Sequence, residues 1–262
     1  MSDEAKKAED LAEGTLMSHL LELRDRLMKA MLGLLIAFIP CAIYANELFT
    51  LIAQPLIDKL PKGTSLIATN IVSPFMTPFK VAFYVGLFAA MPIVIYQVWA
   101  FVAPGLYRRE KHFAVPLLVS SVILFYAGAV FAYFAVFPVM FSYLVGTAPT
   151  GVSYMPDMAS YLDFVLTLFF AFGVAFEMPV AVVLLVITGL VNVDTLGKNR
   201  GYVIIGIFVV AAFLTPPDAI SQIIMAAPMY LLYEGGLVMA RVMLKIRRDS
   251  ADAAKKEEAE TS

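Results

Sequence analysis

The amino-acid sequence predicts an all-α protein that crosses a membrane several times. Hydrophobic residues make up 61% of the 262-residue chain, whereas soluble domains are usually about half apolar. The mean hydropathy is +0.82. Charged residues are only 15% of the chain and they are clustered, which leaves long intervals without any charge. About 20 apolar residues are enough for a helix to span a bilayer core of about 30 Å, so several spans fit.

Six transmembrane helices are expected, with boundaries good to a few residues. The fifth is short, because 14 residues rise only about 21 Å. Thr215, Pro216, Pro217 and Asp218 then force a turn into the sixth, which is expected to be short as well. Residues 1–248 are taken as one six-span membrane domain, and the charged tail 249–262 is expected to be disordered. The expected spans are residues 27–45, 81–102, 113–136, 164–187, 201–214 and 219–240.

The positive charges predict the orientation. Of the 19 lysines and arginines, 16 lie in the N-terminal segment, in the loops after the second and fourth spans, and in the C-terminal tail. The positive-inside rule therefore places both termini in the cytoplasm.

The external loops are expected to be partly ordered. Residues 47–60 are apolar on one side, which predicts short helices along the membrane surface, broken at Pro55. Residues 137–163 are rich in Pro, Gly and Tyr, which is typical of an interfacial cap. Asp218 is expected to cap the sixth span at its N-terminus.

Two carboxylates stand out on the predicted cytoplasmic side. Leucines at helical spacing over residues 16–27 predict an amphipathic helix that leads into the first span. Glu22 on this helix is four residues before Arg26, and Glu110 is the only acid among basic residues 108–111. Each is either part of a surface ion pair or an acceptor for a cationic ligand. Together they would bind two guanidinium groups, each in a bidentate pair that lysine does not make.

Glu177 is the only charged residue between positions 164 and 193. It lies about 15 Å along its helix from the cytoplasmic end, near the bilayer centre. Pro179 removes a backbone donor and frees the carbonyl of Ala175. Glu177 is therefore either a protonated carboxyl that bonds such a carbonyl or a carboxyl that faces a polar groove.

Several function classes are not supported. A single cysteine excludes an intrachain disulfide, and neither an HExxH zinc pattern nor a phosphate-binding GxxxxGK[ST] loop occurs. A zinc site and nucleotide hydrolysis are therefore not supported. No catalytic residues, metal, cofactor or nucleic-acid partner are expected. A proton-coupled small-solute transporter that uses Glu177 is an alternative, although no internal repeat is detected. A passive scaffold is a third class.

Five stretches carry a resemblance that covers residues 14–248, and they occur in the order of one known family. The chain resembles the TatC family, the core multispanning subunit of the twin-arginine, Sec-independent protein translocase. The stretches are HLLELRDRL (19–27), SPFMTPFK (73–80), PIVIYQVWAFVAPGLYRRE (92–110), FGVAFEMP (172–179) and LTPPDAISQ (214–222).

This resemblance implies a fold and a function. The fold would be a glove-like concave arrangement of six helices in the bacterial inner membrane. The protein would recognise twin-arginine signal peptides and move folded precursors across the membrane, using the proton motive force. Its partners would be TatA-like and TatB-like single-span proteins and membrane lipids, in a complex of several copies.

The resemblance also assigns residues. Glu22, Glu110, Arg24 and Phe101 match the positions associated with signal-peptide binding. Glu177 matches the intramembrane glutamate of the family, Pro55 falls at a position associated with function, and Asp218 follows in the matching turn. Thr215 and Gln222 match the region where the single-span partners dock.

Overall fold

The computed structural model describes residues 3–57, 66–102, 111–146, 155–215 and 218–260. In these ranges every regular element is a helix, apart from an isolated parallel bridge between Ile67 and Asp157. The chain divides into two compact units, residues 1–54 with 72–118 and residues 55–71 with 119–262. Each unit is described by itself.

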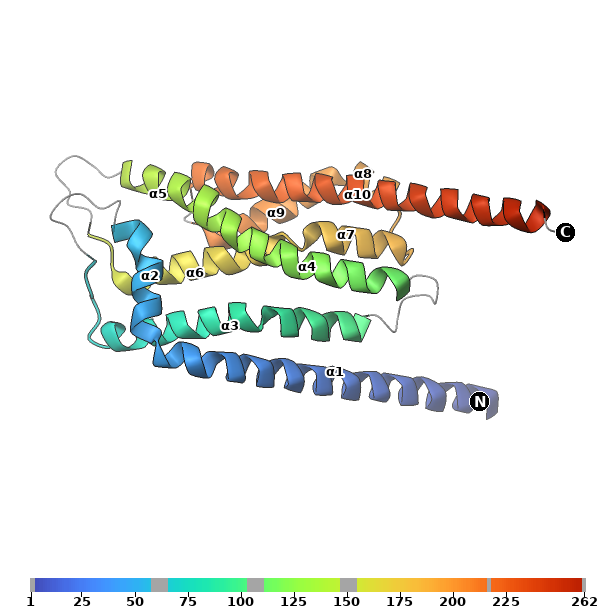
Figure 1. Cartoon of the computed structure of the whole chain (residues 1–262), viewed down its shortest axis with the longest axis horizontal. Helices are drawn as coiled ribbons and strands as arrows, with labels where there is room; N and C mark the ends of the chain where they lie inside the picture. The colour runs from blue at the N-terminus through green and yellow to red at the C-terminus, as the bar shows by residue number, and fades with distance from the viewer. Residues whose placement is uncertain (1–2, 58–65, 103–110, 147–154, 216–217, 261–262) are drawn as a thin grey trace. The chain divides into compact units, whose positions relative to one another are not determined.

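The first unit is built on two long antiparallel helices (Figure 1). Helix α1 (Asp3–Ile43) packs along α3 (Ser73–Val102), and α2 (Ala45–Ile57) follows α1 after a short turn. The two backbones approach closely at Gly86, where a Cβ atom would lie 2.9 Å from the Cα of Phe38. Any larger residue at Gly86 would push the helices apart. The rings of Phe38 and Phe83 meet edge to face beside this contact, with centroids 6.2 Å apart.

The second unit holds the remaining spans. Helix α4 (Lys111–Phe131), which begins in the first unit, passes without a break into the π-helix η2 (Ala132–Val136) and then α5 (Phe137–Gly146). Aromatic side chains fill the contact between this segment and α6 (Met158–Ala175): Phe131 meets Phe172 at 5.7 Å, and Tyr133 meets Phe169 at 6.0 Å. The π-helix lies in the segment that carries these rings, because Tyr133 belongs to it and Phe131 directly precedes it.

Helix α10 is the central partner within the second unit. It packs against α7 (Met178–Ile187), α9 (Arg200–Leu214) and the short α8 (Val193–Lys198). Gly236 allows the contact with α7, because a Cβ there would lie 2.9 Å from the Cα of Pro179. Figure 1 shows α10 (Ala219–Glu260) as the longest helix of this unit, reaching the C-terminus.

The predicted fold class is confirmed, with changes in detail. Five helical segments are long and apolar enough to cross a membrane, and the shorter α9 makes a sixth apolar helix, with 15 residues. The sixth span is not short, because α10 has 42 residues and remains helical as far as Glu260, within the charged tail. The tail stretch ADAAKKEEAE (251–260) is a run of good helix formers and has strong local helix propensity.

Two segments that were predicted to be external differ from expectation. Helix α2 is not broken at Pro55 but continues to Ile57, because a helix loses only one hydrogen bond when proline stands in its last turn. The third apolar segment runs from Val115 to Leu144, so that residues 137–146 extend the span as α5 rather than forming a separate cap. The fourth begins at Met158, earlier than predicted, because Asp157 caps it.

Candidate functional site

An ion pair and a ring contact lie at one end of the α1–α3 pair. Arg26 donates from Nη2 to Oε1 of Glu22 at 3.2 Å, and these side chains are 27% and 34% exposed. No partner of the second Glu22 oxygen is found in the ranges that the structure describes. His19 stacks obliquely on Phe101, with ring centroids 4.6 Å apart.

The structure therefore brings together two of the predicted signal-peptide residues, Glu22 and Phe101, on neighbouring helices. Arg24 turns elsewhere: it pairs with Asp25 at 3.1 Å, and both side chains are largely exposed. Glu110 lies outside the described residues, as does the rest of segment 103–110. The backbone of Pro55 is helical, in the last turn of α2.

Glu177 stands at a break in the fourth span. Helix α6 ends at Ala175 and α7 begins at Met178, with Pro179 in its first turn. The hydroxyl of Ser121, buried on α4, hydrogen-bonds to the Glu177 carboxyl. The other carboxyl oxygen, Oε1, is buried and has no hydrogen-bond partner in the described part of the chain. The carboxyl is thus held by another helix of the unit, with one oxygen left for a further partner.

Asp218 caps the N-terminus of α10, as predicted. Asp218 accepts a hydrogen bond at 2.8 Å from the backbone amide of Ser221, which lowers the pKa of its carboxyl. Thr215 is buried and donates its hydroxyl to the carbonyl of Ala211 at 2.9 Å, which ends α9. Gln222 is half-buried in the first turn of α10. Asp218 and Thr215 therefore have local structural roles in the chain alone.

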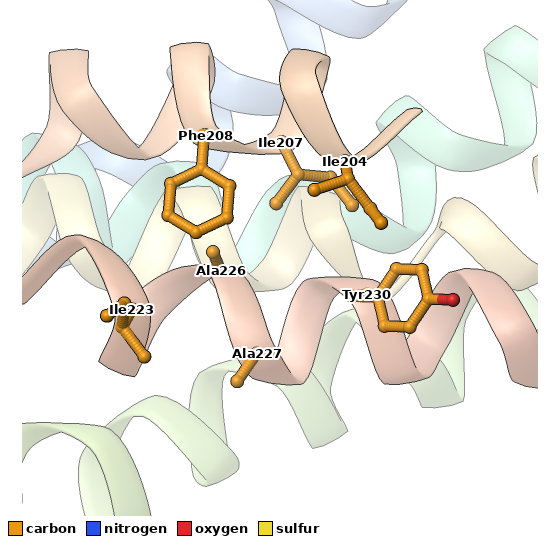
Figure 2. A pocket seen from close by; sticks show the side chains of 7 residues that line it. All are labelled: Ile204, Ile207, Phe208, Ile223, Ala226, Ala227 and Tyr230. Carbon is orange, nitrogen blue, oxygen red and sulfur yellow. The ribbon is translucent and has the colours of Figure 1, made fainter. Parts of the chain in front are cut away.

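An apolar groove of about 220 Å³ runs between α9 and α10. Figure 2 shows its walls, with one row of side chains from each helix facing the other. Tyr230 closes one end, and its hydroxyl is directed away from the apolar side chains. The groove is lined by Ile204, Ile207, Phe208, Ile223, Ala226, Ala227 and Tyr230.

Sequence reasoning missed an ion pair behind this groove. Arg200 donates to both oxygens of Glu234, and Tyr230 donates its hydroxyl to Glu234 at 2.7 Å. Arg200 also donates to the carbonyl of Gly197 at 3.2 Å. The sequence did contain a signal for this pair. Two antiparallel spans joined by a tight turn bring the start of the first, with Arg200, close to the later part of the second, with Glu234.

A second missed contact joins two loop segments 88 residues apart. The Oδ2 atom of Asp157 accepts from the amide and the hydroxyl of Thr69, at 3.0 and 2.8 Å. Its Oδ1 atom accepts from the amides of Ala159 and Ser160, at 3.1 and 2.9 Å, and so caps α6. The amides of Ser160 and Thr69 hold the pKa of Asp157 well below its usual range. No sequence signal predicts this pairing.

The described residues contain no group of three or more His, Cys, Asp or Glu side chains that could hold a metal ion. The arrangement instead offers apolar grooves and isolated carboxyls. Such groups bind and orient a partner through hydrogen bonds and apolar contact.

Comparisons with known proteins point in one direction. A family model described as Sec-independent protein translocase protein (TatC) matches residues 18–228. A TatC protein of Azotobacter chroococcum mcd 1 is 52% identical over 222 residues, which cover 85% of this chain and 87% of that protein. A TatC protein of Escherichia coli (strain K12) is 50% identical over 226 residues, covering 86% and 88%.

A solved structure is similar as well. The crystal structure described as twin arginine translocase receptor TatC superposes with a TM-score of 0.77 at 35% sequence identity. The match covers 86% of this chain and 98% of that one. The similarity therefore extends over the whole fold and is not confined to single motifs.

Proposed function

The chain belongs to the TatC family of Sec-independent protein translocase proteins, and from that premise we propose how its residues serve the twin-arginine translocase. As a member it is a core component of this translocase and a multi-pass protein of the bacterial inner membrane. The alternative of a small-solute transporter finds no support. The chain works in a complex with other Tat subunits.

We propose that Glu22 receives one arginine of a twin-arginine signal peptide. The observation that carries this proposal is the resting ion pair of the half-exposed Glu22 carboxylate with Arg26 at 3.2 Å, and Arg26 lines a groove together with Phe101. The site already holds a guanidinium in the free protein, so an arginine of the signal replaces Arg26 with similar geometry. A lysine offers a point charge without the planar pair of donors, and it fits this exchange less well.

The second arginine is assigned to Glu110, on the resemblance and on its position among basic residues. Arg24, which pairs with the exposed Asp25, is assigned a supporting role in which it sets the local charge. This assignment needs both termini in the cytoplasm, where precursors are made. The distribution of lysine and arginine supports that orientation.

The α9–α10 hairpin is the proposed docking region for single-span TatA-like and TatB-like partners. Support comes from its open apolar groove and from the short α9, which rises about 22 Å and leaves part of a bilayer unmatched. Thr215 and Gln222 stand at one end of the hairpin, with Asp218 in the turn. Pro55 keeps its proposed role in the external surface helix.

Glu177 is proposed to face the path of the signal peptide or of a partner helix. Its unpaired buried oxygen supports this, because an unsatisfied carboxyl oxygen at membrane depth is costly until a donor reaches it. Translocation of folded precursors would draw on the proton motive force, as the family resemblance implies. No covalent chemistry by the chain is needed.

Site-specific crosslinking tests the proposal. A photoreactive amino acid is placed next to each carboxylate, at position 23 or 109, so that Glu22 and Glu110 are kept. A matched probe stands at Leu32, which is exposed on α1 two to three turns away. Inner-membrane vesicles are then exposed to a precursor with a twin-arginine signal. Adducts at positions 23 and 109 that disappear with a twin-lysine precursor are expected, and equal adducts at Leu32 would contradict the assignment.

A further inference from the structure

A second apolar groove adjoins the proposed arginine site, and of its lining residues the resemblance assigns only Phe101 to signal-peptide binding. It lies between α1 and α3 and has a volume of about 290 Å³. This is at the lower end of the range for small-molecule sites, so it accepts one or two side chains and not a whole segment. Its lining residues are Leu23, Arg26, Leu27, Ala30, Val94, Gln97, Val98 and Phe101.

The groove contains a polar atom that needs a partner. The side-chain oxygen Oε1 of Gln97 is buried, and no donor to it is found within the described ranges. A buried acceptor without a hydrogen bond costs roughly 1–3 kcal/mol. A lipid acyl chain in the groove would leave this oxygen unpaired, whereas a peptide backbone carries one N–H donor per residue. The chemistry of the groove therefore favours a peptide.

The position of the groove relative to Glu22 limits which peptide segment enters it. Arg26 is both the resting partner of Glu22 and part of the groove wall. From Glu22 to Ala30 the helix rises about 12 Å. An extended peptide covers that length in about four residues. Signal peptides have a positively charged segment followed by an apolar one, which is the order of polarity met along this path.

We propose that this groove is a subsite for the first apolar residues that follow the arginine pair of the signal peptide, with Gln97 accepting a backbone N–H from the peptide. The inference rests on the proposed function of Glu22. It adds a contact that reads the start of the apolar segment. The number of residues between the arginine pair and the apolar segment then becomes part of recognition, because the arginine and the apolar side chains must fit their sites at the same time.

Peptide binding to the full chain in nanodiscs tests the subsite. Fluorescence anisotropy measures the Kd for a labelled twin-arginine signal peptide and for one whose first four residues after the arginine pair are serine. Gln97→Leu removes the acceptor and Ala30→Phe fills the groove. Leu32→Phe, at an exposed position outside the groove, is the matched control.

The loss of one hydrogen bond predicts a Kd about five-fold higher for Gln97→Leu, and Ala30→Phe should raise it at least as much. Ala30→Phe should raise the Kd of the serine peptide much less than that of the parent peptide, because serine side chains gain little from an apolar groove. Unchanged binding of the parent peptide by both variants, while Glu22→Gln weakens it, would overturn the subsite and leave the proposed function standing. Loss of the Glu22 effect would instead remove the proposed function.

A photoreactive probe at Val98 gives a second test, which reads contact with the peptide rather than its affinity. Val98 lines the groove and is 57% exposed. Adducts within the first four residues after the arginine pair are expected with the bound peptide. Adducts with lipid alone, in the presence of saturating peptide, would show that an acyl chain fills the groove and would overturn the proposal.

Discussion

Asp157 fastens the segment around Thr69 to the start of α6, and replacing it should loosen both. Asp157→Asn keeps the shape of the side chain and keeps an oxygen for the α6 cap. It places an amide NH₂ where Oδ2 now accepts from the Thr69 amide at 3.0 Å. A donor then faces a donor, and the Thr69 amide loses its partner. Asp157→Ala removes the cap as well.

The size of the effect follows from the bonds that are lost. A hydrogen bond to a charged group contributes about 1.5–3 kcal/mol, and an N-cap about 1 kcal/mol. Because Thr69 is exposed and Asp157 only partly buried, water replaces part of each lost bond. We therefore expect about 1 kcal/mol of local opening free energy for Asp157→Asn and about 2 kcal/mol for Asp157→Ala.

The pH dependence has a definite sign. The folded-state pKa of Asp157 is lowered by the amides of Ser160 and Thr69. Its stabilisation is therefore fully present above the unfolded-state pKa of about 3.9 and is lost as the pH falls through the lower folded value. The difference between the parent and Asp157→Asn should be constant from about pH 5 to pH 8 and should shrink only in stronger acid.

Hydrogen exchange measured by mass spectrometry in nanodiscs reads the opening directly. Peptides that contain Thr69 and Ser160 should exchange about five- to thirty-fold faster in the variants, whereas peptides from α9 should not change. Asp194→Asn, at an exposed acid in the first turn of α8, is the matched control. Unchanged exchange at Thr69 in Asp157→Ala would refute the reasoning.

Three further predictions concern the second unit. Gly128→Ala should lower the melting temperature in detergent, because its Cβ would lie 2.4 Å from the carbonyl oxygen of Phe172, while Gly206→Ala, with no atom within 4 Å, should not lower it. Arg200→Lys keeps the charge but loses the bidentate pair with Glu234 and the bond to the Gly197 carbonyl in α8. Hydrogen exchange in α8 should therefore quicken, by a few fold at most since both side chains are partly exposed, and unchanged exchange would mean that charge alone is sufficient. Ser121→Ala should shift the infrared band of the Glu177 carboxyl, and the shift should be absent in a Glu177→Gln background; a shift that persists there would come from another group.

The sequence predicts spans well where one physical signal dominates. Charge-free intervals located the apolar helices, and the Asp218 cap followed from local chemistry. The length of α10 and the continuity of α4 into α5 were not predicted. Hydropathy measures the apolar part of a helix, and a helix extends beyond that part wherever local propensity allows.

The candidate site was predicted only in part, for a related reason. Glu22 and Glu177 are visible in the sequence because a charge is conspicuous among apolar residues. The partner of Glu177 is not, since Ser121 is an ordinary residue until packing places it beside the carboxyl. The pairing of Asp157 with Thr69 depends on the path of two loops, and no local pattern encodes that path.

The role of Glu22 is the central claim, and the affinity of Glu22→Gln for twin-arginine and twin-lysine signal peptides tests it most directly. The substitution keeps the size of the side chain and removes its charge, and Asp25→Asn on the same exposed helix is the control. Loss of a charge-assisted pair predicts a Kd for the twin-arginine peptide about ten- to hundred-fold higher, with little change for the twin-lysine peptide or in the control. A folded Glu22→Gln protein that binds the twin-arginine peptide as tightly as the parent would contradict the account.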